Sequence, residues 1–168
     1  MRAGRAGIRY PAGMSRHMRL STLALTVACA LGAITAFAQA KRAAAPIPIA
    51  VYKTPTCGCC GKWVAYMERN GFKATVTEMP DTSPARTKNG VPARLGSCHT
   101  SVVGGYAIEG HVPADDIKRL LREKPDVVGL AAPGMPQGSP GMDEPDSPPY
   151  EVLAFDKQGQ TRVFSTHR

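Results

Sequence analysis

Along the chain from residue 47, apolar and polar residues recur in a pattern that predicts a strand, a helix and a second strand. The segment 47–53 alternates and then becomes apolar, as a buried strand does. In the segment 59–70 the apolar side chains recur at helical spacing, and Gly71 follows as a stop signal. The segment 74–77 has the pattern of a second strand. A strand, helix and strand of these lengths predict two parallel strands joined by a right-handed crossover.

The pattern further along the chain predicts a hairpin, a helix and a closing hairpin. Gly104-Gly105 separates two strand-like segments, and a two-residue turn of this kind has positive φ at both positions. The remaining elements are expected in this order: a short helix at 83–88, strands at 100–103 and 106–109, a helix between Pro113 and Pro125, a loop rich in glycine and proline at 127–149, and strands at 150–155 and 161–165. The order β-α-β, short helix, β-β-α predicts an α/β protein with a thioredoxin-like fold and a mixed sheet, extended at the C-terminus by the loop and the closing hairpin.

The first 40 residues have a separate composition, which indicates a secretory signal peptide. They contain five arginines and no acidic residue, and an apolar stretch is followed by small residues. Cleavage near Ala38 or Ala40 fits the rule for such peptides. The apolar stretch is short for a membrane span, so no stable membrane insertion is expected. We therefore predict a signal peptide at 1–40, a linker at 41–46 and a single exported domain at 47–168.

The net charge of the exported part differs from that of the whole chain. The chain has 21 basic and 13 acidic residues, a net charge of +8. Because the signal peptide takes five arginines with it, 16 basic residues remain against the same 13 acidic residues, a net charge of +3. Binding of nucleic acid requires a basic stripe on the folded domain. We therefore expect no nucleic-acid partner.

Three cysteines lie within the four residues Cys57-Gly58-Cys59-Cys60, where the first strand leads into the first helix. Only Cys57 and Cys60 are spaced for an unstrained disulfide. Thiolates are soft ligands that favour Cu(I), zinc or iron–sulfur centres, and the start of a helix lowers the pKa of a thiol. The cluster therefore predicts a metal site, a redox pair with a third thiol, or both. In an oxidising compartment, full pairing of Cys57 with Cys60 and of Cys59 with Cys98 is a further alternative.

The predicted hairpin brings more candidate ligands to the same place. Its two-glycine turn pairs the strands so that Cys98 lies opposite His111, with Cβ atoms about 4.5 to 5.5 Å apart. That distance suits two ligands of one metal ion, and in a thioredoxin-like fold the segment around Cys98 passes beside the start of the first helix. Because side chains alternate along a strand, His99 is expected on the other face. In the loop that follows, Met135 and Met142 carry thioethers, which are soft Cu(I) ligands that form no disulfides.

Four groups of residues occur in a specific order along the domain. They are Thr56-Cys57-Gly58-Cys59-Cys60-Gly61, Ser97-Cys98-His99-Thr100, Gly104-Gly105-Tyr106 with Glu109-Gly110-His111-Val112-Pro113, and Gly129-Leu130-Ala131-Ala132-Pro133-Gly134-Met135-Pro136 with Gly138-Ser139-Pro140-Gly141-Met142. Together they resemble the CopG-like family of secreted bacterial metal-binding proteins, formerly a domain of unknown function. The resemblance covers roughly residues 49–164. It implies a thioredoxin-like fold, copper handling under copper stress and a cysteine-bridged copper site at the CxCC segment.

These observations predict a periplasmic copper-binding protein that serves copper resistance or homeostasis. The expected ligands of Cu(I) are Cys57, Cys59, Cys60, Cys98, His111 and Met135. Copper efflux or chaperone proteins are the expected protein partners. The chain is interpreted as a metal-binding protein, and an enzymatic role in the interconversion of Cu(I) and Cu(II) is left open. Two alternatives remain, a thiol-disulfide oxidoreductase that uses Cys57 and Cys60, and a zinc site, which is the weaker alternative to copper.

Overall fold

The computed structural model describes residues 45–142 and 144–168. Its elements in chain order are β1 (Ile47–Lys53), α2 (Gly58–Arg69), β2 (Phe72–Glu78), α3 (Ser83–Lys88), the 3-10 helix η1 (Ala93–Leu95), β3 (His99–Val103), β4 (Tyr106–Gly110), α4 (Ala114–Glu123), β5 (Gly129–Ala132), β6 (Tyr150–Phe155) and β7 (Thr161–His167). The predicted signal peptide at 1–40 and most of the predicted linker at 41–46 lie outside the described residues. In the part of the chain that the structure describes, no helix is both long enough and apolar enough to cross a membrane.

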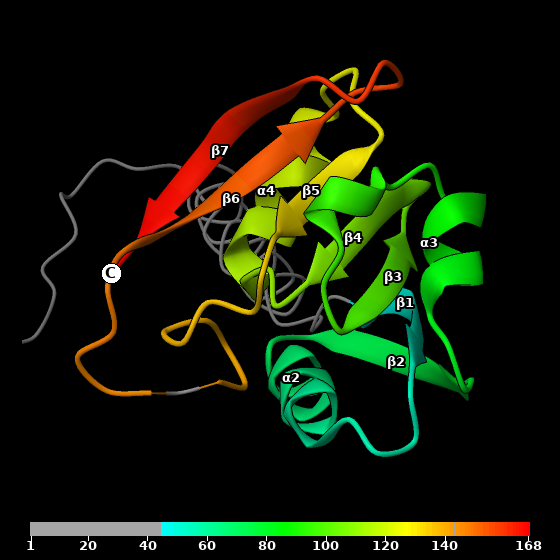
Figure 1. Cartoon of the computed structure of the whole chain (residues 1–168), viewed down its shortest axis with the longest axis vertical. Helices are drawn as coiled ribbons and strands as arrows, with labels where there is room; N and C mark the ends of the chain where they lie inside the picture. Colours follow the sequence, from blue (N-terminus) through cyan, green and yellow to red (C-terminus); the bar gives the residue numbers. More distant parts are fainter. Residues whose placement is uncertain (1–44, 143) are drawn as a thin grey trace, which may run out of the picture. The chain divides into compact units, whose positions relative to one another are not determined.

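Seven strands form one mixed sheet in the order β2-β1-β3-β4-β5-β6-β7 (Figure 1). β1 and β2 are parallel, as the strand-helix-strand pattern predicts, and β4 and β5 are also parallel. The other neighbouring pairs are antiparallel. The prediction of an α/β fold with a mixed sheet is therefore confirmed. The chain order up to α4 is consistent with a thioredoxin-like fold.

The region predicted as a loop at 127–149 contains a strand, and in this respect the prediction is wrong. β5 is buried along its whole length, pairs in parallel with β4 and pairs antiparallel with β6. Its sequence, Gly-Leu-Ala-Ala, has low strand propensity, so the local pattern contains no strand signal. Hydrogen bonds to a neighbouring strand on each side hold this segment extended. The C-terminal hairpin therefore continues the sheet.

The hairpin of β3 and β4 forms as predicted. Its two turn glycines have φ values of 56° and 86°. The register extends to Thr100 opposite Glu109. Beyond this pair the regular pleat ends, because Cys98 lies in a bend and Gly110 has a φ of 71°. This break determines where the side chains next to it point.

Hydrophobic residues are buried on both faces of the sheet. The larger core joins one face to the two long helices, through the helical residues Trp63, Met67, Ile117 and Leu120. The smaller core consists of Val91, Leu95, Ala107, Ala131 and Phe155. Ala107 and Ile108 are neighbours on β4 but belong to different cores, which places the two cores on opposite faces. α2 and α4 therefore cover one face, and the segment around η1 covers the other.

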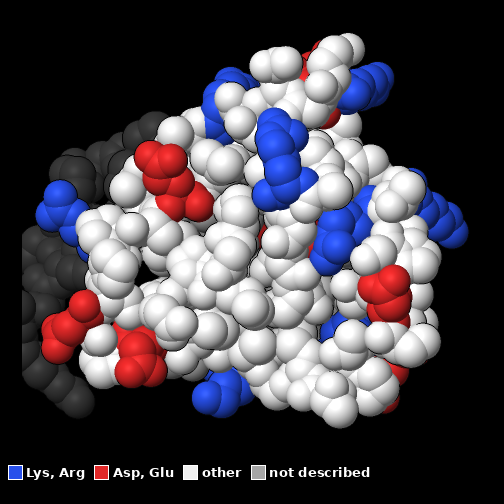
Figure 2. All heavy atoms as spheres, viewed as in Figure 1, with Lys and Arg blue, Asp and Glu red and all other residues white. Residues whose placement is uncertain are grey.

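Charged side chains on the face shown in Figure 2 occur in small separate groups of either sign. Basic and acidic groups share this view of the described residues, and no continuous basic stripe crosses it. The distribution agrees with the small net charge of the chain beyond the predicted signal peptide. That no nucleic acid binds stays a prediction.

Candidate metal centre

The start of α2 carries three of the cysteines. Cys57 is the N-cap residue, with an extended backbone, and Cys60 is fully buried in the first turn. Cys57 and Cys60 form a disulfide with their Cα atoms 5.3 Å apart, which is the pairing that the spacing predicts. The free N–H groups of a first helical turn favour a thiolate beside them. The region therefore suits both metal binding and disulfide chemistry.

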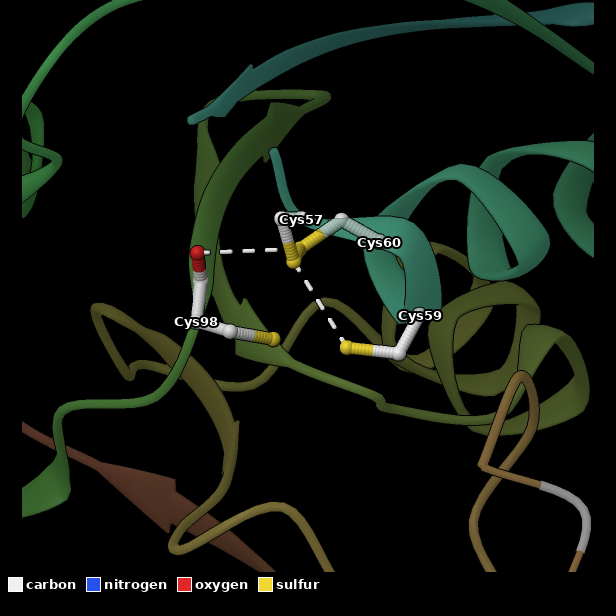
Figure 3. Close-up of side chains that lie close together, drawn as sticks. All are labelled: Cys57, Cys59, Cys60 and Cys98. Atoms are coloured by element: carbon white, nitrogen blue, oxygen red, sulfur yellow. Dashed lines mark hydrogen bonds between the residues drawn. A yellow bond between two sulfur atoms is a disulfide. The ribbon is translucent and has the colours of Figure 1, made fainter. Parts of the chain in front are cut away.

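The fourth cysteine reaches the same place from the sheet. Cys98 lies directly before β3, and Figure 3 shows its side chain beside the start of α2. The sulfur atoms of all four cysteines lie within 4.8 Å of one another. The Sγ atoms of Cys57 and Cys59 are 3.6 Å apart, and Cys60 Sγ is 3.7 Å from the carbonyl oxygen of Cys98. Cys59 and Cys98 are free thiols, so the alternative of a second disulfide between them is not found here.

His111 meets Cys98, as the hairpin predicts. Its Nε2 atom is 3.0 Å from Cys98 Sγ, and its Nδ1 atom is 2.8 Å from the carbonyl oxygen of Pro140. Because a carbonyl only accepts hydrogen bonds, Nδ1 donates its proton, and in the neutral ring the lone pair of Nε2 is directed at the sulfur. His111 is fully buried. Its ring is therefore held in the orientation that a metal ligand needs.

His99 also belongs to this cluster, and the expectation that it faces away is wrong. Its Nδ1 atom is 3.4 Å from Cys98 Sγ, and Cys98, His99 and His111 form a second group with ligand atoms within 4.8 Å of one another. The His99 ring lies 4.4 Å from the Trp63 ring and 5.1 Å from the His111 ring. Alternation fails because Cys98 lies in a bend and Gly110 has a positive φ, which together change the directions of Cys98 and His111. The glycine directly before His111 is the sequence signal for this break.

Burial keeps two members of the cluster uncharged in the metal-free protein. Burial, followed by the charge of the neighbouring Cys59, raises the pKa of the Cys98 thiol to about 12. Burial, followed by the charge of His111, lowers the pKa of His99 to about 3. At neutral pH, Cys98 is therefore a thiol and His99 an uncharged imidazole. A metal ion that binds Cys98 must displace its proton.

The loop between β5 and β6 packs on the start of α2. Gly141 has a φ of 89°, and a Cβ atom there would lie 2.8 Å from the backbone nitrogen of Trp63 and 3.0 Å from the carbonyl oxygen of Cys59. Only glycine fits this close approach. The same loop provides the carbonyl group of Pro140 that holds the ring of His111. The long C-terminal loop is therefore part of the site.

The two methionines of this loop differ in position. Met135 has a φ of 53°, and the residue is 40% exposed. Met142 directly follows the glycine that touches α2, and it is half-buried. Metal binding by Met135 stays a prediction, and no ligand role was predicted for Met142.

The fold and the cluster define the class of the protein, an α/β domain with a thioredoxin-like order of elements and a cysteine and histidine cluster able to hold a metal ion. Two solved structures are similar to this chain. One, "Copper resistance protein copG- Form 2", is 45% identical, with a TM-score of 0.69, and the match covers 73% of this chain and 99% of that chain. The other, "Copper resistance protein copG- Form 1", is 46% identical, with a TM-score of 0.68, and the match covers 73% of this chain and 98% of that chain. The chain belongs to the family of these copG proteins.

A family model also matches part of the chain. Residues 95–142 match the model described as "Protein of unknown function, DUF411". This segment includes Cys98, both histidines of the cluster and the first part of the loop, which contains the glycine that packs on α2. No curated protein matches the chain. The resemblance inferred from the four motifs is therefore confirmed.

Proposed function

We propose that this protein is a periplasmic copper-binding protein that serves copper resistance or homeostasis. The observation that carries the proposal is the convergence of four cysteine sulfurs within 4.8 Å of one another, with Nε2 of His111 3.0 Å from one of them. Soft thiolate ligands favour Cu(I). The two similar structures are described as copper resistance proteins, which supports copper over zinc, the weaker alternative.

In the reduced protein the thiolates hold Cu(I) and bridge neighbouring ions. The ligands in this proposal are Cys57, Cys59, Cys60 and Cys98, with His111 and Met135 as additional ligands. Reduction of the Cys57–Cys60 disulfide takes two electrons and two protons and frees two thiols, whose protons leave when Cu(I) binds. A redox role in which copper is oxidised by the disulfide also involves two electrons. Two Cu(I) ions that are oxidised to Cu(II) release the two electrons that one disulfide accepts.

A second candidate function is thiol-disulfide exchange by Cys57 and Cys60. The observation that favours it is the disulfide at the N-terminus of α2, where Cys57 is partly exposed and Cys60 is buried. An accessible first cysteine and a protected second one suit exchange with an external thiol. Cys59 separates the two functions, because exchange uses two thiols whereas the copper site uses Cys59 as a ligand.

The test is titration of the purified, anaerobically reduced protein with Cu(I) and with Zn(II), followed by metal counting. The wild type is expected to bind Cu(I) stoichiometrically. Cys59→Ser is expected to weaken Cu(I) binding by more than about 100-fold, since loss of a group that merely orients a ligand already costs about 10- to 100-fold. It is expected to leave reduction of the Cys57–Cys60 disulfide by a dithiol unchanged. Thr56→Ala, at an exposed neighbouring position, is the control.

Each function has an outcome that excludes it. If the reduced wild type binds no stoichiometric copper, the copper proposal fails. If Cys59→Ser keeps full Cu(I) affinity, Cys59 is not a ligand and the proposed ligand set is wrong. A purely structural zinc site predicts that the protein unfolds when a chelator removes the metal.

Export to the periplasm and transfer of copper to an efflux or chaperone protein are part of the same proposal. The basic and apolar leader at 1–40 supports export. N-terminal sequencing of protein recovered from the periplasmic fraction is expected to start at Gln39 or Lys41. Protein that keeps residues 1–40 and stays in the cytoplasm would contradict the localisation.

A further inference from the structure

A carboxylate is buried on the face of the sheet that α2 does not cover. Glu109 of β4 is fully buried and lies opposite Thr100 of β3, which is also fully buried. It shares its face with Ala107, a member of the smaller core. A buried carboxylate is costly unless a cation and several hydrogen-bond donors surround it. The sulfur cluster does not account for this group.

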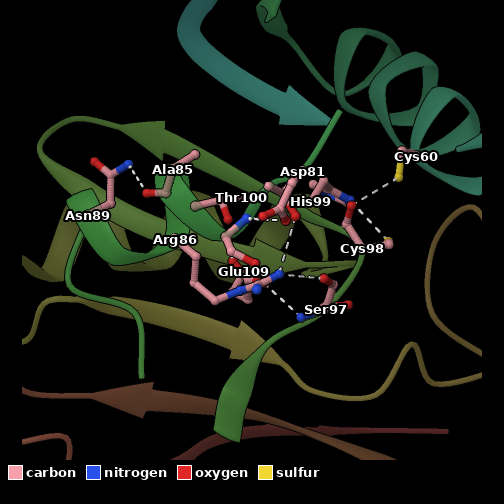
Figure 4. Close-up of polar contacts among 12 residues, drawn as sticks. Cys60, Asp81, Ala85, Arg86, Asn89, Ser97, Cys98, His99, Thr100 and Glu109 are labelled. Carbon is pink, nitrogen blue, oxygen red and sulfur yellow. Dashed lines mark hydrogen bonds and ion pairs between the residues drawn. The ribbon is translucent and has the colours of Figure 1, made fainter. Parts of the chain in front are cut away.

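Both carboxylate oxygens of Glu109 accept hydrogen bonds, and the ion pair of Glu109 with Arg86 contacts the backbone of Ser97 (Figure 4). Its Oε1 atom accepts hydrogen bonds from Arg86 Nε at 2.8 Å and from the backbone nitrogen of Ser97 at 2.7 Å. Its Oε2 atom accepts a hydrogen bond from the hydroxyl group of Thr100 at 2.6 Å. Arg86 Nη2 donates to the carbonyl oxygen of Ser97 at 2.8 Å. The ion pair therefore binds both backbone polar groups of Ser97.

Ser97 is also held by the backbone of β4. A Cβ atom at Gly110 would lie 2.5 Å from Ser97 Oγ and 2.7 Å from Ser97 Cβ, so only a glycine admits Ser97 at this position. Ser97 is thus enclosed by the ion pair and by the strand that leads to His111. An ion pair that serves stability alone is often replaceable by apolar residues without loss. This pair differs because its hydrogen bonds fix the residue before Cys98.

The position of Cys98 depends on this segment. Cys98 lies in a bend before the first residue of β3 and is partly exposed, so neither strand pairing nor complete burial fixes it. Its sulfur nevertheless lies 3.0 Å from Nε2 of His111 and within 4.8 Å of the other three sulfurs. Metal–ligand distances vary by only about 0.2 Å. A small displacement of Ser97 therefore suffices to remove Cys98 from the site.

We propose that Glu109 and Arg86 are positioning residues that hold Cys98 at the metal centre through the backbone of Ser97. The copper part of this inference rests on the proposed function. The placement of the thiol is a property of the metal-free protein and is tested without copper.

The test compares Glu109→Gln and Arg86→Lys with the control Asp116→Asn in the full-length protein. Glutamine keeps the shape of the side chain and loses the charge, whereas lysine keeps the charge and loses the planar fork that reaches Ser97. Asp116 is also a buried carboxylate, and its oxygen Oδ2 contacts Ser165 and His167 of β7. The control therefore removes a buried charge from a separate network.

The first measurement is the alkylation rate of Cys98 relative to that of Cys59, determined by mass spectrometry on metal-free protein with the Cys57–Cys60 disulfide intact. Glu109→Gln and Arg86→Lys are expected to raise this ratio about tenfold, because the segment before Cys98 opens locally. Asp116→Asn is expected to leave the ratio unchanged. General unfolding makes both thiols equally reactive and would also raise the ratio, so the ratio is compared only among variants whose circular dichroism and unfolding midpoint match those of the wild type. If Glu109→Gln does not fold, Arg86→Lys decides the outcome.

The second measurement is the Cu(I) affinity of the reduced variants. It is expected to fall about 10- to 100-fold in Glu109→Gln and Arg86→Lys and to stay unchanged in Asp116→Asn, as for other groups that orient a metal ligand. An unchanged alkylation ratio, or an equal rise in Asp116→Asn, would overturn the inference. If the wild type binds no copper, the alkylation ratio still decides the positioning role, so failure of the proposed function is recognised separately.

Discussion

His99 makes the metal-free protein sensitive to acid. The ring is fully buried between Trp63 and His111, and its pKa is lowered from 6.5 to about 3, first by burial and then by His111. Between pH 6.5 and about pH 3 the unfolded chain binds a proton at His99 that the folded protein does not bind. The contribution to stability is therefore fully present above pH 6.5 and is lost as the pH falls towards 3. At about 1.4 kcal/mol per pH unit, acidification from pH 7 to pH 5 costs about 2 kcal/mol.

The perturbation that isolates this effect is His99→Leu. Nε2 of His99 has no hydrogen-bond partner among the described residues, so an apolar side chain of similar size removes the titrating group without breaking a bond at that atom. Urea unfolding of both proteins at pH 5, 7 and 8, with a metal chelator present, gives the free energies of unfolding.

Between pH 7 and pH 5 the free energy of unfolding of the wild type is expected to fall by about 2 kcal/mol more than that of His99→Leu. Titrating groups that both proteins share cancel in this difference. Between pH 7 and pH 8 the difference is expected to be constant, which serves as the internal control. Parallel loss of stability in the two proteins down to pH 5 would refute the reasoning.

Two further predictions concern the cluster and the loop that packs on it. Burial raises the pKa of the Cys98 thiol to about 12, so Cu(I) must displace its proton at every pH below that value. The apparent Cu(I) affinity is therefore expected to rise about tenfold per pH unit for each proton released. Competition with a chromophoric Cu(I) chelator between pH 6 and pH 8 measures this slope, and a flat profile would contradict a thiol at Cys98. The added Cβ atom of Gly141→Ala would collide with the backbone of Trp63. This variant is therefore expected to lower the free energy of unfolding by about 1 to 3 kcal/mol and to weaken Cu(I) binding. Gly134→Ala also has a positive φ but meets no atom within 4 Å, so equal losses of Cu(I) affinity in the two variants would show that the contact with α2 has no role.

Periodicity and spacing were sufficient for the features that depend on short segments. The strand-helix-strand unit follows from the spacing of apolar residues, and the Cys57–Cys60 disulfide follows from the separation that an unstrained bond requires. The meeting of Cys98 with His111 was predictable although the two residues are 13 positions apart, because a two-residue turn fixes the register as far as Thr100 opposite Glu109, and each ligand lies two residues beyond that pair.

Contacts between distant segments account for the features that the pattern missed. β5 is a strand because β4 and β6 hydrogen bond to it, although its glycine and alanine residues have little strand propensity. His99 joins the cluster because a bend and a positive φ interrupt the alternation on which its prediction relied. Glu109 and Arg86, 23 residues apart, meet at Ser97 only when α3 lies against the sheet. Local patterns record the preferences of a segment, whereas these features depend on the free energy of contacts that exist only after the chain has folded.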